Sequence, residues 1–383
     1  MISVTHVSFS YPHDTSVFED VSMELSAGER VVLLGSNGSG KTTLARLMNG
    51  SLVPTGGEVC VDGTNTADVS STHSSLQVGL IRQDPANQLI SASVFEEVAF
   101  GPSHLGLSQP EVLARAEKSL ELCGIAHLRD RTTYELSGGQ QQLLAFAATL
   151  ALSPRYLVLD EVYVQLDART RTKIRSLVTS LVSAGLGVLE LSHSVESLFG
   201  ASRVLWLHDG RIAWSGSPND FLQDASRAAA AGLMHTGYAR VLQKAVAQGF
   251  DLSSSRDIKA LGRHLRKKGL QDEAKSLLLE ESSSCGRSSR ARLNCDVDSD
   301  VCSNAHTLAL RKASLTFDTT RALDQVSFES KGELVLLAGR SGSGKTTAAR
   351  VLAGGLEADG GKVVFDGARV SKSRKSSLCG YRF

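Results

Sequence analysis

A glycine-rich stretch near the start of the chain has the residue types and spacing of a phosphate-binding loop. Glycines let the backbone wrap so that several N–H groups point inward at a phosphate, and a helix that starts there adds its positive end. In this pattern Lys41 reaches the outer phosphates of a nucleoside triphosphate, and the Thr42 hydroxyl ligates Mg²⁺. The stretch comprises Gly35, Ser36, Asn37, Gly38, Ser39, Gly40, Lys41, Thr42 and Thr43.

A second cluster of small residues stands directly before a helical apolar run. It comprises Leu136, Ser137, Gly138, Gly139 and Gln140. Small residues at a helix N-terminus leave backbone N–H groups accessible, so this segment is a second candidate anion site, able to touch a γ-phosphate. Further along, the strand pattern YLVLDEV ends in two acids, Asp160 and Glu161.

These three segments come in the order that is typical of ATP-binding cassette (ABC) ATPases. The chain resembles this family over residues 2–220 and again from residue 309 to its end. The resemblance implies ATP binding and hydrolysis with Mg²⁺. It implies that Asp160 holds Mg²⁺ and that Glu161 polarises the attacking water as general base.

The resemblance also assigns roles to four residues outside the three segments. Gln83, in GLIRQDPANQ, matches the Q-loop glutamine that contacts Mg²⁺ and the water. His193, after GVLELS, matches the switch histidine that senses the γ-phosphate, and Asp167 matches the D-loop aspartate. Tyr11, in FSYP, matches the aromatic residue that stacks on adenine. The signature motif is matched by Ser137, Gly138, Gly139 and Gln140.

Part of the pattern occurs twice. One copy begins at Val7 and the other at Ala313; each has alternating strands, a buried apolar strand and a glycine turn that enters a helix. A period of this length indicates tandem domains rather than a solenoid. In the second copy, Thr346 is the expected Mg²⁺ ligand and Phe317 the adenine-stacking residue. Its nucleotide-binding residues are predicted to be Phe317, Gly339, Gly342, Gly344, Lys345, Thr346 and Thr347.

We therefore predict an α/β fold of the P-loop ABC type, with a mixed sheet core, an antiparallel edge sheet and a helical signature subdomain. The predicted parts are a complete nucleotide-binding domain (1–220), a helical extension (221–280), a flexible linker (281–306) and the N-terminal part of a second nucleotide-binding domain (307–383). The linker is rich in Ser, Arg and Asp, and it has too few large apolar residues to bury a core.

Overall composition argues against several other classes of protein. The net charge of +1 lacks the basic excess typical of nucleic-acid binders, so no nucleic-acid partner is expected. The longest strongly apolar stretch, Leu143–Leu152, is far short of the ~20 residues of a membrane-spanning helix, and the N-terminus lacks a secretory signal. The spacing of the cysteines fits no zinc site; they are Cys60, Cys123, Cys285, Cys295, Cys302 and Cys379.

The segment QDPANQLISASVFEEVAFGPSHLGL resembles the ATPase subunits of energy-coupling-factor importers for cobalt- and vitamin-type substrates. This resemblance implies that the Q-loop region faces transmembrane importer subunits, where Asp84, Glu96 and Glu97 meet basic residues. It also implies a cytoplasmic protein, peripheral on the inner face of the cell membrane. The transported substrate stays open, because a separate membrane protein selects it in these importers.

A ribosome-associated translation factor is the alternative interpretation, because such factors also have two nucleotide domains and a linker. They usually carry DEPTNHLD, however, whereas this chain has DEVYVQLD, and their linkers are usually long charged helices. A chromosome or DNA-repair ATPase would need long coiled coils, and no sustained heptads occur.

The second copy stops early. Aligned on the first copy, Phe383 corresponds to Arg82, one residue before the Q-loop glutamine. We expect a truncated chain that lacks a second signature motif, acidic strand end and switch histidine. ABC domains pair head to tail, so the nucleotide at Lys41 needs the signature motif of another ABC domain, in the same chain or in another copy. The signature at 137–140 would in turn cover the nucleotide at Lys345.

Overall fold

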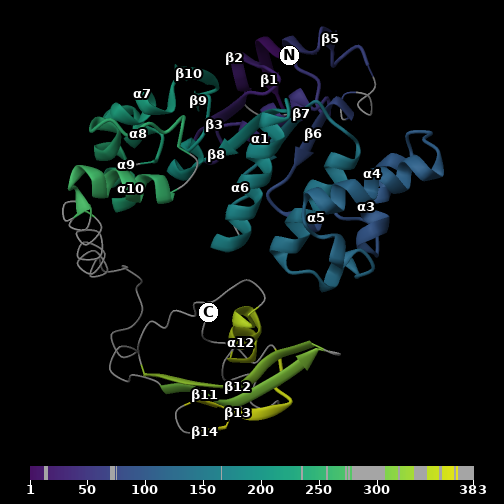
Figure 1. Cartoon of the computed structure of the whole chain (residues 1–383), viewed down its shortest axis with the longest axis vertical. Coiled ribbons are helices and arrows are strands. Elements are labelled where there is room, and N and C mark those ends of the chain that lie inside the picture. Colours follow the sequence, from purple (N-terminus) through teal and green to yellow (C-terminus); the bar gives the residue numbers. More distant parts are fainter. Residues whose placement is uncertain are drawn as a thin grey trace. The chain divides into compact units, whose positions relative to one another are not determined.

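The computed structural model describes residues 1–12, 16–69, 74, 76–164, 166–233, 236–255, 258–271, 274, 277, 307–317, 320–331, 343–352, 356–365 and 368–369. The chain divides into two compact units, Met1–Arg290 and Ala291–Phe383, which are described separately (Figure 1). The predicted linker and the cysteines at 285, 295, 302 and 379 lie outside the described residues.

A six-stranded sheet forms the centre of the first unit, in the order β10-β9-β3-β8-β7-β6. All its neighbouring strands are parallel except β10, which pairs antiparallel with β9. Every residue of β3, β7 and β8 is buried, as expected for parallel strands that are covered on both faces. The bounds are β3 Arg30–Leu34, β6 Val78–Ile81, β7 Tyr156–Asp160, β8 Gly187–Ser192, β9 Arg203–His208 and β10 Arg211–Gly216.

A four-stranded antiparallel sheet, in the order β2-β1-β4-β5, lies beside the central one. Along β2, buried and exposed residues largely alternate, which is the period of a sheet with one buried face. One apolar cluster, which includes Ile2, Phe18, Leu33 and Leu44, joins this sheet to the central sheet and to helix α1. The bounds are β1 Ile2–Ser10, β2 Ser16–Leu25, β4 Gly56–Val61, β5 Thr64–Asn65 and α1 Lys41–Met48.

Three helices, α3, α4 and α5, form a subdomain to one side of the central sheet (Figure 1). They share an apolar cluster with β6, β7 and helix α6, so the subdomain is continuous with the core. One short 3₁₀ turn precedes α3, and two more lie between α4 and α5. The bounds are η1 Pro85–Asn87, α3 Val94–Ser103, α4 Gln109–Leu122, η2 Ala126–Leu128, η3 Thr133–Glu135, α5 Gly138–Ala151 and α6 Ala168–Ser183.

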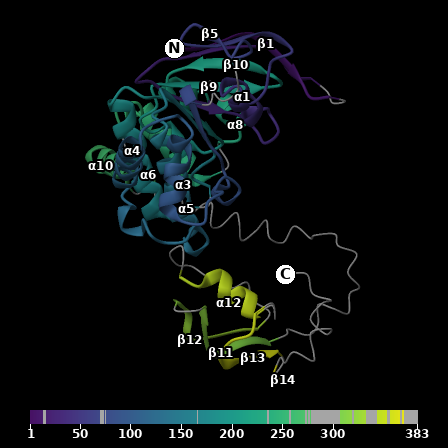
Figure 2. The ribbon, with the colours of Figure 1, turned by 90° about the vertical axis from the view of Figure 1, so that its right-hand side faces the viewer.

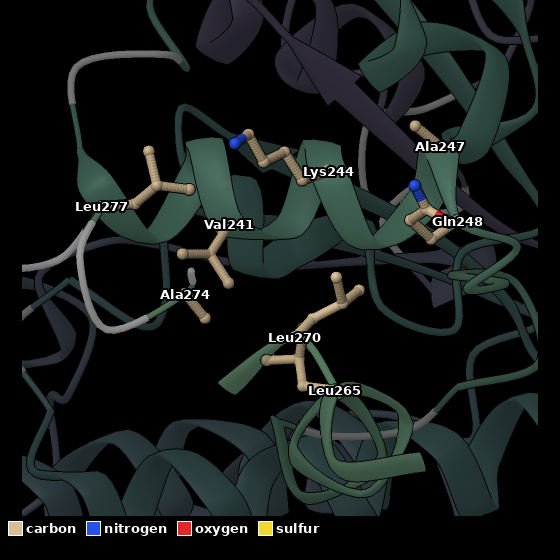
Figure 3. Close-up of a pocket in the computed structure, with 8 residues that line it drawn as sticks. All are labelled: Val241, Lys244, Ala247, Gln248, Leu265, Leu270, Ala274 and Leu277. Carbon is tan, nitrogen blue, oxygen red and sulfur yellow. The ribbon is translucent and has the colours of Figure 1, made fainter. Parts of the chain in front are cut away.

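Four further helices pack on β9 and on the turn η4 through a third apolar cluster, in which Phe221 is fully buried. Between α9 and α10, Val241 faces Leu265 and Leu270 across an apolar groove of about 170 Å³ (Figure 3). Among the described residues, no helix is both long and apolar enough to cross a bilayer. The bounds are η4 Val195–Leu198, α7 Pro218–Gln223, α8 Ala225–Ala230, α9 Gly237–Ala247 and α10 Ile258–Lys268.

The second unit contains an antiparallel sheet in the order β12-β11-β13-β14, which matches the β2-β1-β4-β5 order of the first unit. Helix α12 packs on this sheet through Ala348 and Val351 (Figure 2). The bounds are β11 Thr307–Phe317, β12 Thr320–Lys331, α12 Lys345–Leu352, β13 Gly360–Phe365 and β14 Ala368–Arg369. The predicted α/β fold, with a mixed core, an antiparallel edge sheet and a helical subdomain, is confirmed in the first unit.

Candidate nucleotide site

The predicted site residues of the first unit follow four neighbouring strands of the central sheet. The glycine loop follows β3, His193 follows β8, Glu161 follows β7, and Gln83 comes two residues after β6. These strands are parallel and adjacent in the order β3-β8-β7-β6. Because the carboxyl ends of parallel strands meet at one edge, the fold brings together residues from distant segments, at the edge where such sheets bind ligands.

Glycine is required at two points of the loop. Gly40 immediately precedes α1 with φ of +97°, a conformation that other residues rarely adopt, and a Cβ there would lie 2.6 Å from the Phe18 ring. A Cβ on Gly35 would lie 2.9 Å from the Leu207 carbonyl oxygen. The buried hydroxyl of Ser39 has no hydrogen-bond partner in the described part of the chain. This tight, glycine-lined loop with an orphaned hydroxyl fits a bound phosphate.

Lys41 turns its ammonium group into the loop. Its Nζ donates to the carbonyl oxygens of Gly35 and Ser36, each at 2.9 Å, and lies 3.7 Å from a carboxylate oxygen of Glu161. The side chain is 6% exposed. Burial lowers the pKa of Lys41, and the charges of Glu161 and Asp160 partly oppose this effect. A cation is therefore held where the outer phosphates of a nucleotide would bind.

Thr42 and Asp160 form a pair of oxygen ligands next to this cation. The Thr42 hydroxyl donates to Oδ2 of Asp160 at 2.8 Å. Burial raises the pKa of Asp160, and the hydrogen bond from Thr42 lowers it in part. A hydroxyl and a carboxylate in contact are the hard oxygen donors that Mg²⁺ takes from proteins, so these two residues fit that ion.

Glu161 lies between Lys41 and His193. Its Oε1 is 3.2 Å from Nδ1 of His193, and its side chain is only 12% exposed. Its backbone φ is +50°, in the left-handed region that non-glycine residues rarely enter. The carboxylate thus has a cationic neighbour on one side and an imidazole on the other, at the edge of the site.

Two further predicted residues lie at the margins. The Tyr11 hydroxyl is 3.1 Å from the hydroxyl of Thr43, and its ring meets Phe9 edge-on at 4.9 Å, so the aromatic ring is held beside the start of α1. Gln83 is exposed just beyond β6.

The signature residues form the N-terminus of α5. Ser137 caps this helix in a capping box: its hydroxyl accepts from the Gln140 amide at 3.4 Å, and Gln140 Oε1 accepts from the Ser137 amide at 2.9 Å. Apart from the helix's own backbone and the adjacent residues, no described atom lies within 4 Å of a Cβ added at Gly138, whereas one at Gly139 would meet Thr170 at 3.0 Å. The helix end is therefore open on the side of Gly138.

Asp167 caps helix α6. Its Oδ1 accepts from the amides of Arg169 and Thr170, at 2.9 and 3.0 Å. In this structure the D-loop aspartate therefore orders the start of α6, a role that sequence reasoning did not assign.

In the second unit, Lys345 begins α12 as Lys41 begins α1. Gly344 precedes it with φ of +85°, and a Cβ there would lie 2.2 Å from the Ala322 carbonyl oxygen, so glycine is again required. Thr347 is partly buried on α12. Gly339, Gly342 and the side chains of Phe317 and Thr346 lie outside the described residues.

Sequence reasoning missed a buried ion pair between two of the strands that carry the site. Arg30, at the start of β3, donates from Nε and Nη2 to Oε2 of Glu190 on β8, at 3.2 and 2.5 Å. Its Nη1 donates to the Phe199 carbonyl at 2.6 Å. The signal in the sequence is a glutamate in the middle of the apolar run GVLELS, since a charge in a buried strand needs a partner.

The family model for ABC transporters matches residues 18–164 and 323–380, more than half of the chain. The chain belongs to the ABC transporter family. As an ABC protein, it is an ATPase that uses ATP and Mg²⁺.

Known ABC proteins match more than half of the chain. The energy-coupling factor transporter ATP-binding protein EcfA of Syntrophomonas wolfei is 38% identical over 257 residues, 66% of this chain and 94% of that protein. The cobalt import ATP-binding protein CbiO of Syntrophus aciditrophicus is 38% identical over 220 residues, 57% of this chain and 79% of that protein. The structure of cbiO1 from Clostridium perfringens, part of the ABC transporter complex cbiONQ, matches with a TM-score of 0.55 at 28% identity and covers 63% of this chain and 98% of that one.

Proposed function

We propose that this chain is the ATP-hydrolysing subunit that energises a membrane importer of the energy-coupling-factor type, for a vitamin or a transition-metal ion. The observation that carries the hydrolytic part is the contact between Lys41, Glu161 and His193 beside the Thr42–Asp160 pair. The importer part is supported by relatives named as energy-coupling-factor and cobalt-import ATPases.

In this proposal the glycine loop and Lys41 bind the phosphates of ATP. Phosphate oxygens replace the loop carbonyls of Gly35 and Ser36 as partners of the Lys41 ammonium. Thr42 and Asp160, with Gln83, hold Mg²⁺, which neutralises charge on the phosphates when bound. Tyr11 stacks on the adenine.

Glu161 accepts the proton of the attacking water, and His193 senses the γ-phosphate. The carboxylate suits this role because it is nearly buried and fixed between two polar neighbours. A general base that is already oriented needs little rearrangement before it can take a proton.

A second ABC domain completes each site head to tail, in the same chain or in another copy. The open N-terminus of α5, with Ser137, Gly138, Gly139 and Gln140, faces the nucleotide held by the partner domain. A bacterial ABC transporter cassette solved as a dimer supports this assembly; it matches with a TM-score of 0.52 at 26% identity and covers 57% of this chain and 99% of that one. Asp167 lies at this interface, and the loop at 339–347 binds a second nucleotide.

The Q-loop region is the proposed face for transmembrane subunits at the inner side of the membrane. Ile90 is 68% exposed there, and Asp84 and Glu96 are exposed as well. Glu97 is only 6% exposed and its carboxylate accepts from two backbone amides, so it serves the loop itself rather than a partner. The proposed parts of the chain are the cassette (1–220), the helical extension (221–280), the linker (281–306) and the partial second cassette (307–383).

The test is mass spectrometry of proteins that co-purify with the tagged protein from its own cells in mild detergent. Transmembrane importer subunits are the expected partners, and they would indicate the substrate class. Recovery of ribosomal proteins without any membrane protein would overturn the importer proposal and favour a translation factor. Tagged Glu161→Gln protein provides a second sample. Because this variant should bind ATP without hydrolysing it, complexes that depend on bound ATP should persist.

A further inference from the structure

We propose that a cavity beside helix α6 binds a small organic anion, with the carboxylate of the ligand at Tyr163 and Arg175 and its apolar part against Val182 and Phe199. The cavity has a volume of about 270 Å³. Pockets for small-molecule ligands begin at about 300 Å³, so a compact ligand fits this space. Tyr163 lies two residues after Glu161, so the ligand would contact the turn that carries the proposed general base. Binding itself depends neither on the importer proposal nor on ATP hydrolysis.

Three parts of the first unit enclose this cavity. Arg30, at the start of β3, forms one wall, and one face of α6 forms another. The third wall is the loop between α9 and α10, which contributes Ser253 and Ser254. The backbone amide of Gly200 donates to the carbonyl of Leu252 at 2.9 Å and so bonds this loop to the cassette. The cavity is therefore a defined feature of the junction between the cassette and the helical extension.

Tyr163 brings an unpaired hydroxyl group to the cavity wall. The residue is only 9% exposed, and its hydroxyl has no hydrogen-bond partner in the described part of the chain. Burial raises the pKa of Tyr163, so the hydroxyl keeps its proton and can donate. A buried polar group without a partner is costly, and native proteins usually satisfy it with a protein group, an ordered water or an ion. An oxygen atom of a ligand would supply the missing acceptor.

Arg175 adds an excess of positive charge next to this hydroxyl. Its Nη2 donates to Oε2 of Glu196 at 3.1 Å, and Nη1 of Arg171 donates to the same oxygen at 3.3 Å. One carboxylate therefore serves two guanidinium groups. The Nε of Arg175 is buried without a partner among the described residues, and its guanidinium lies 5.4 Å from the centre of the Tyr163 ring. Two neighbouring side chains thus have an unused donor, and the local charge favours an anionic acceptor.

Other charged groups near the cavity do not cancel this excess. Arg30 donates twice to Glu190, so this pair contributes no net charge. One oxygen of Glu190, Oε1, has no partner among the described residues, but Glu190 does not line the cavity. Asp251, in the closing loop, accepts from the amides of Ser253 and Ser254 at 3.0 and 3.3 Å and does not line the cavity either. The described residues that line the cavity include no acid.

The remaining lining residues indicate a ligand with an apolar part. Val178, Val182 and Phe199 present hydrocarbon groups to the cavity. The hydroxyls of Thr179 and Ser183 already donate to backbone carbonyls of α6, each at 2.9 Å. An inorganic ion would leave the hydrocarbon surface in contact with water, whereas a short aliphatic or aromatic carboxylate would cover it. The structure therefore favours a monocarboxylate with a small apolar tail.

The experiment is a calorimetric titration of the full-length protein with benzoate and with hexanoate, in the presence of saturating MgADP. ADP occupies the glycine loop, which could otherwise bind a carboxylate itself. We expect both acids to bind. Benzamide has the shape of benzoate without its charge, and it should bind at least about tenfold more weakly. Equal affinity for benzamide and benzoate would overturn the assignment of an anion. No binding of either acid up to its solubility limit would show that the cavity holds only water, and would overturn the proposal.

Tyr163→Phe removes only the hydroxyl group and should weaken benzoate binding by about tenfold, since a hydrogen bond to a charged group is lost. The variant should fold, because no described residue loses a hydrogen-bond partner. Tyr134→Phe is the control. Tyr134 is 77% exposed and does not line the cavity, so benzoate affinity should stay as in the wild type. Equal benzoate affinity in Tyr163→Phe and in the wild type would place the bound acid elsewhere and refute the site.

Arg175→Met is a second variant and tests the charge. Arg171 still pairs with Glu196, so the carboxylate keeps a partner. Benzoate affinity should fall about tenfold or more, whereas benzamide affinity should change less than about twofold. An equal loss for both probes would indicate collapse of the cavity rather than loss of the cation, and would contradict the proposal. Neither measurement uses ATP turnover or a membrane protein, so failure of the importer proposal would leave these results unchanged.

Discussion

The hydroxyl of Thr42 donates to the carboxylate of Asp160 across 2.8 Å, although 118 positions separate the two residues in the sequence. Folding of β3 and β7 into one sheet is what brings them together. The two oxygen ligands that we propose for Mg²⁺ are thus adjacent before nucleotide arrives.

Asp160→Asn should lower ATP turnover and raise the Mg²⁺ concentration that turnover requires, because an amide keeps the shape but loses the charge that attracts the cation. The measurement is an Mg²⁺ titration of ATP hydrolysis. Asp84→Asn, an exposed acid of the Q-loop, is the control and should titrate as the wild type does. Wild-type Mg²⁺ dependence in Asp160→Asn would remove this residue from the metal site.

The pKa of Asp160 is raised by burial, which predicts a pH dependence of stability in Mg²⁺-free buffer. The native state then binds a proton more readily than the unfolded state, so this carboxyl destabilises the fold when ionised. As the pH falls through the raised pKa of the native state towards 3.8, the ordinary aspartate pKa, Asp160 becomes protonated. The destabilisation caused by its buried charge should then disappear. Asp160→Asn should therefore be more stable than the wild type at pH 7, and the difference should shrink as the pH falls. A constant difference across this range would contradict the prediction.

Glu161→Gln should bind ATP but hydrolyse it about 10²–10⁴-fold more slowly, the usual contribution of a general base. Phosphate release and equilibrium ATP binding are the two measurements. Glu29→Gln provides the control, because Glu29 pairs with Arg203 at 3.0 Å away from the nucleotide site and should keep normal turnover. Unchanged phosphate release in Glu161→Gln would exclude Glu161 as the base.

Lys41→Ala should abolish nucleotide binding at the first loop, with a loss of about 100-fold or more in affinity, since a buried cation that pairs with phosphate is removed. Binding of a fluorescent ATP analogue measures this loss. Lys345→Ala is the matched change in the second unit and should leave the first site intact. ATP affinity like that of the wild type at the first site in Lys41→Ala would refute the phosphate-loop assignment.

The buried pair Arg30–Glu190 should respond differently to single and double substitution. Arg30→Met leaves the Glu190 carboxylate buried without its partner, and should lower the free energy of unfolding by about 3–5 kcal/mol. Adding Glu190→Leu should recover most of that loss. Both tryptophans, Trp206 and Trp214, lie in the first unit, so their fluorescence during denaturation reports its stability alone. A double variant as unstable as the single one would show that packing, rather than the charge, is decisive.

Residues whose type is dictated by phosphate and metal chemistry could be predicted from the sequence. The glycine loop, the two acids after β7 and the small residues before α5 are local patterns, and each has a fixed place at the end of a strand or helix. Their roles on bound nucleotide stay predictions.

Contacts between distant segments could not be predicted in the same way. The pairing of Arg30 with Glu190, the cap that Asp167 places on α6 and the bond from Gln142 to Arg82 each depend on which surfaces the fold brings together. Periodicity reports which face of an element is buried, but it does not report the partner on the other side.

The left-handed backbone conformation of Glu161 affects which substitutions selection for stability would favour. At a backbone φ of +50°, the conformational energy of a glutamate is higher than that of glycine or asparagine by roughly 1–2 kcal/mol. Replacement of Glu161 by glycine would thus remove the backbone strain and, at the same time, remove the proposed general base for ATP hydrolysis. Laboratory evolution that selects for thermostability alone would favour such inactive variants at this position. A library of variants selected for thermostability must therefore also be screened for ATP turnover.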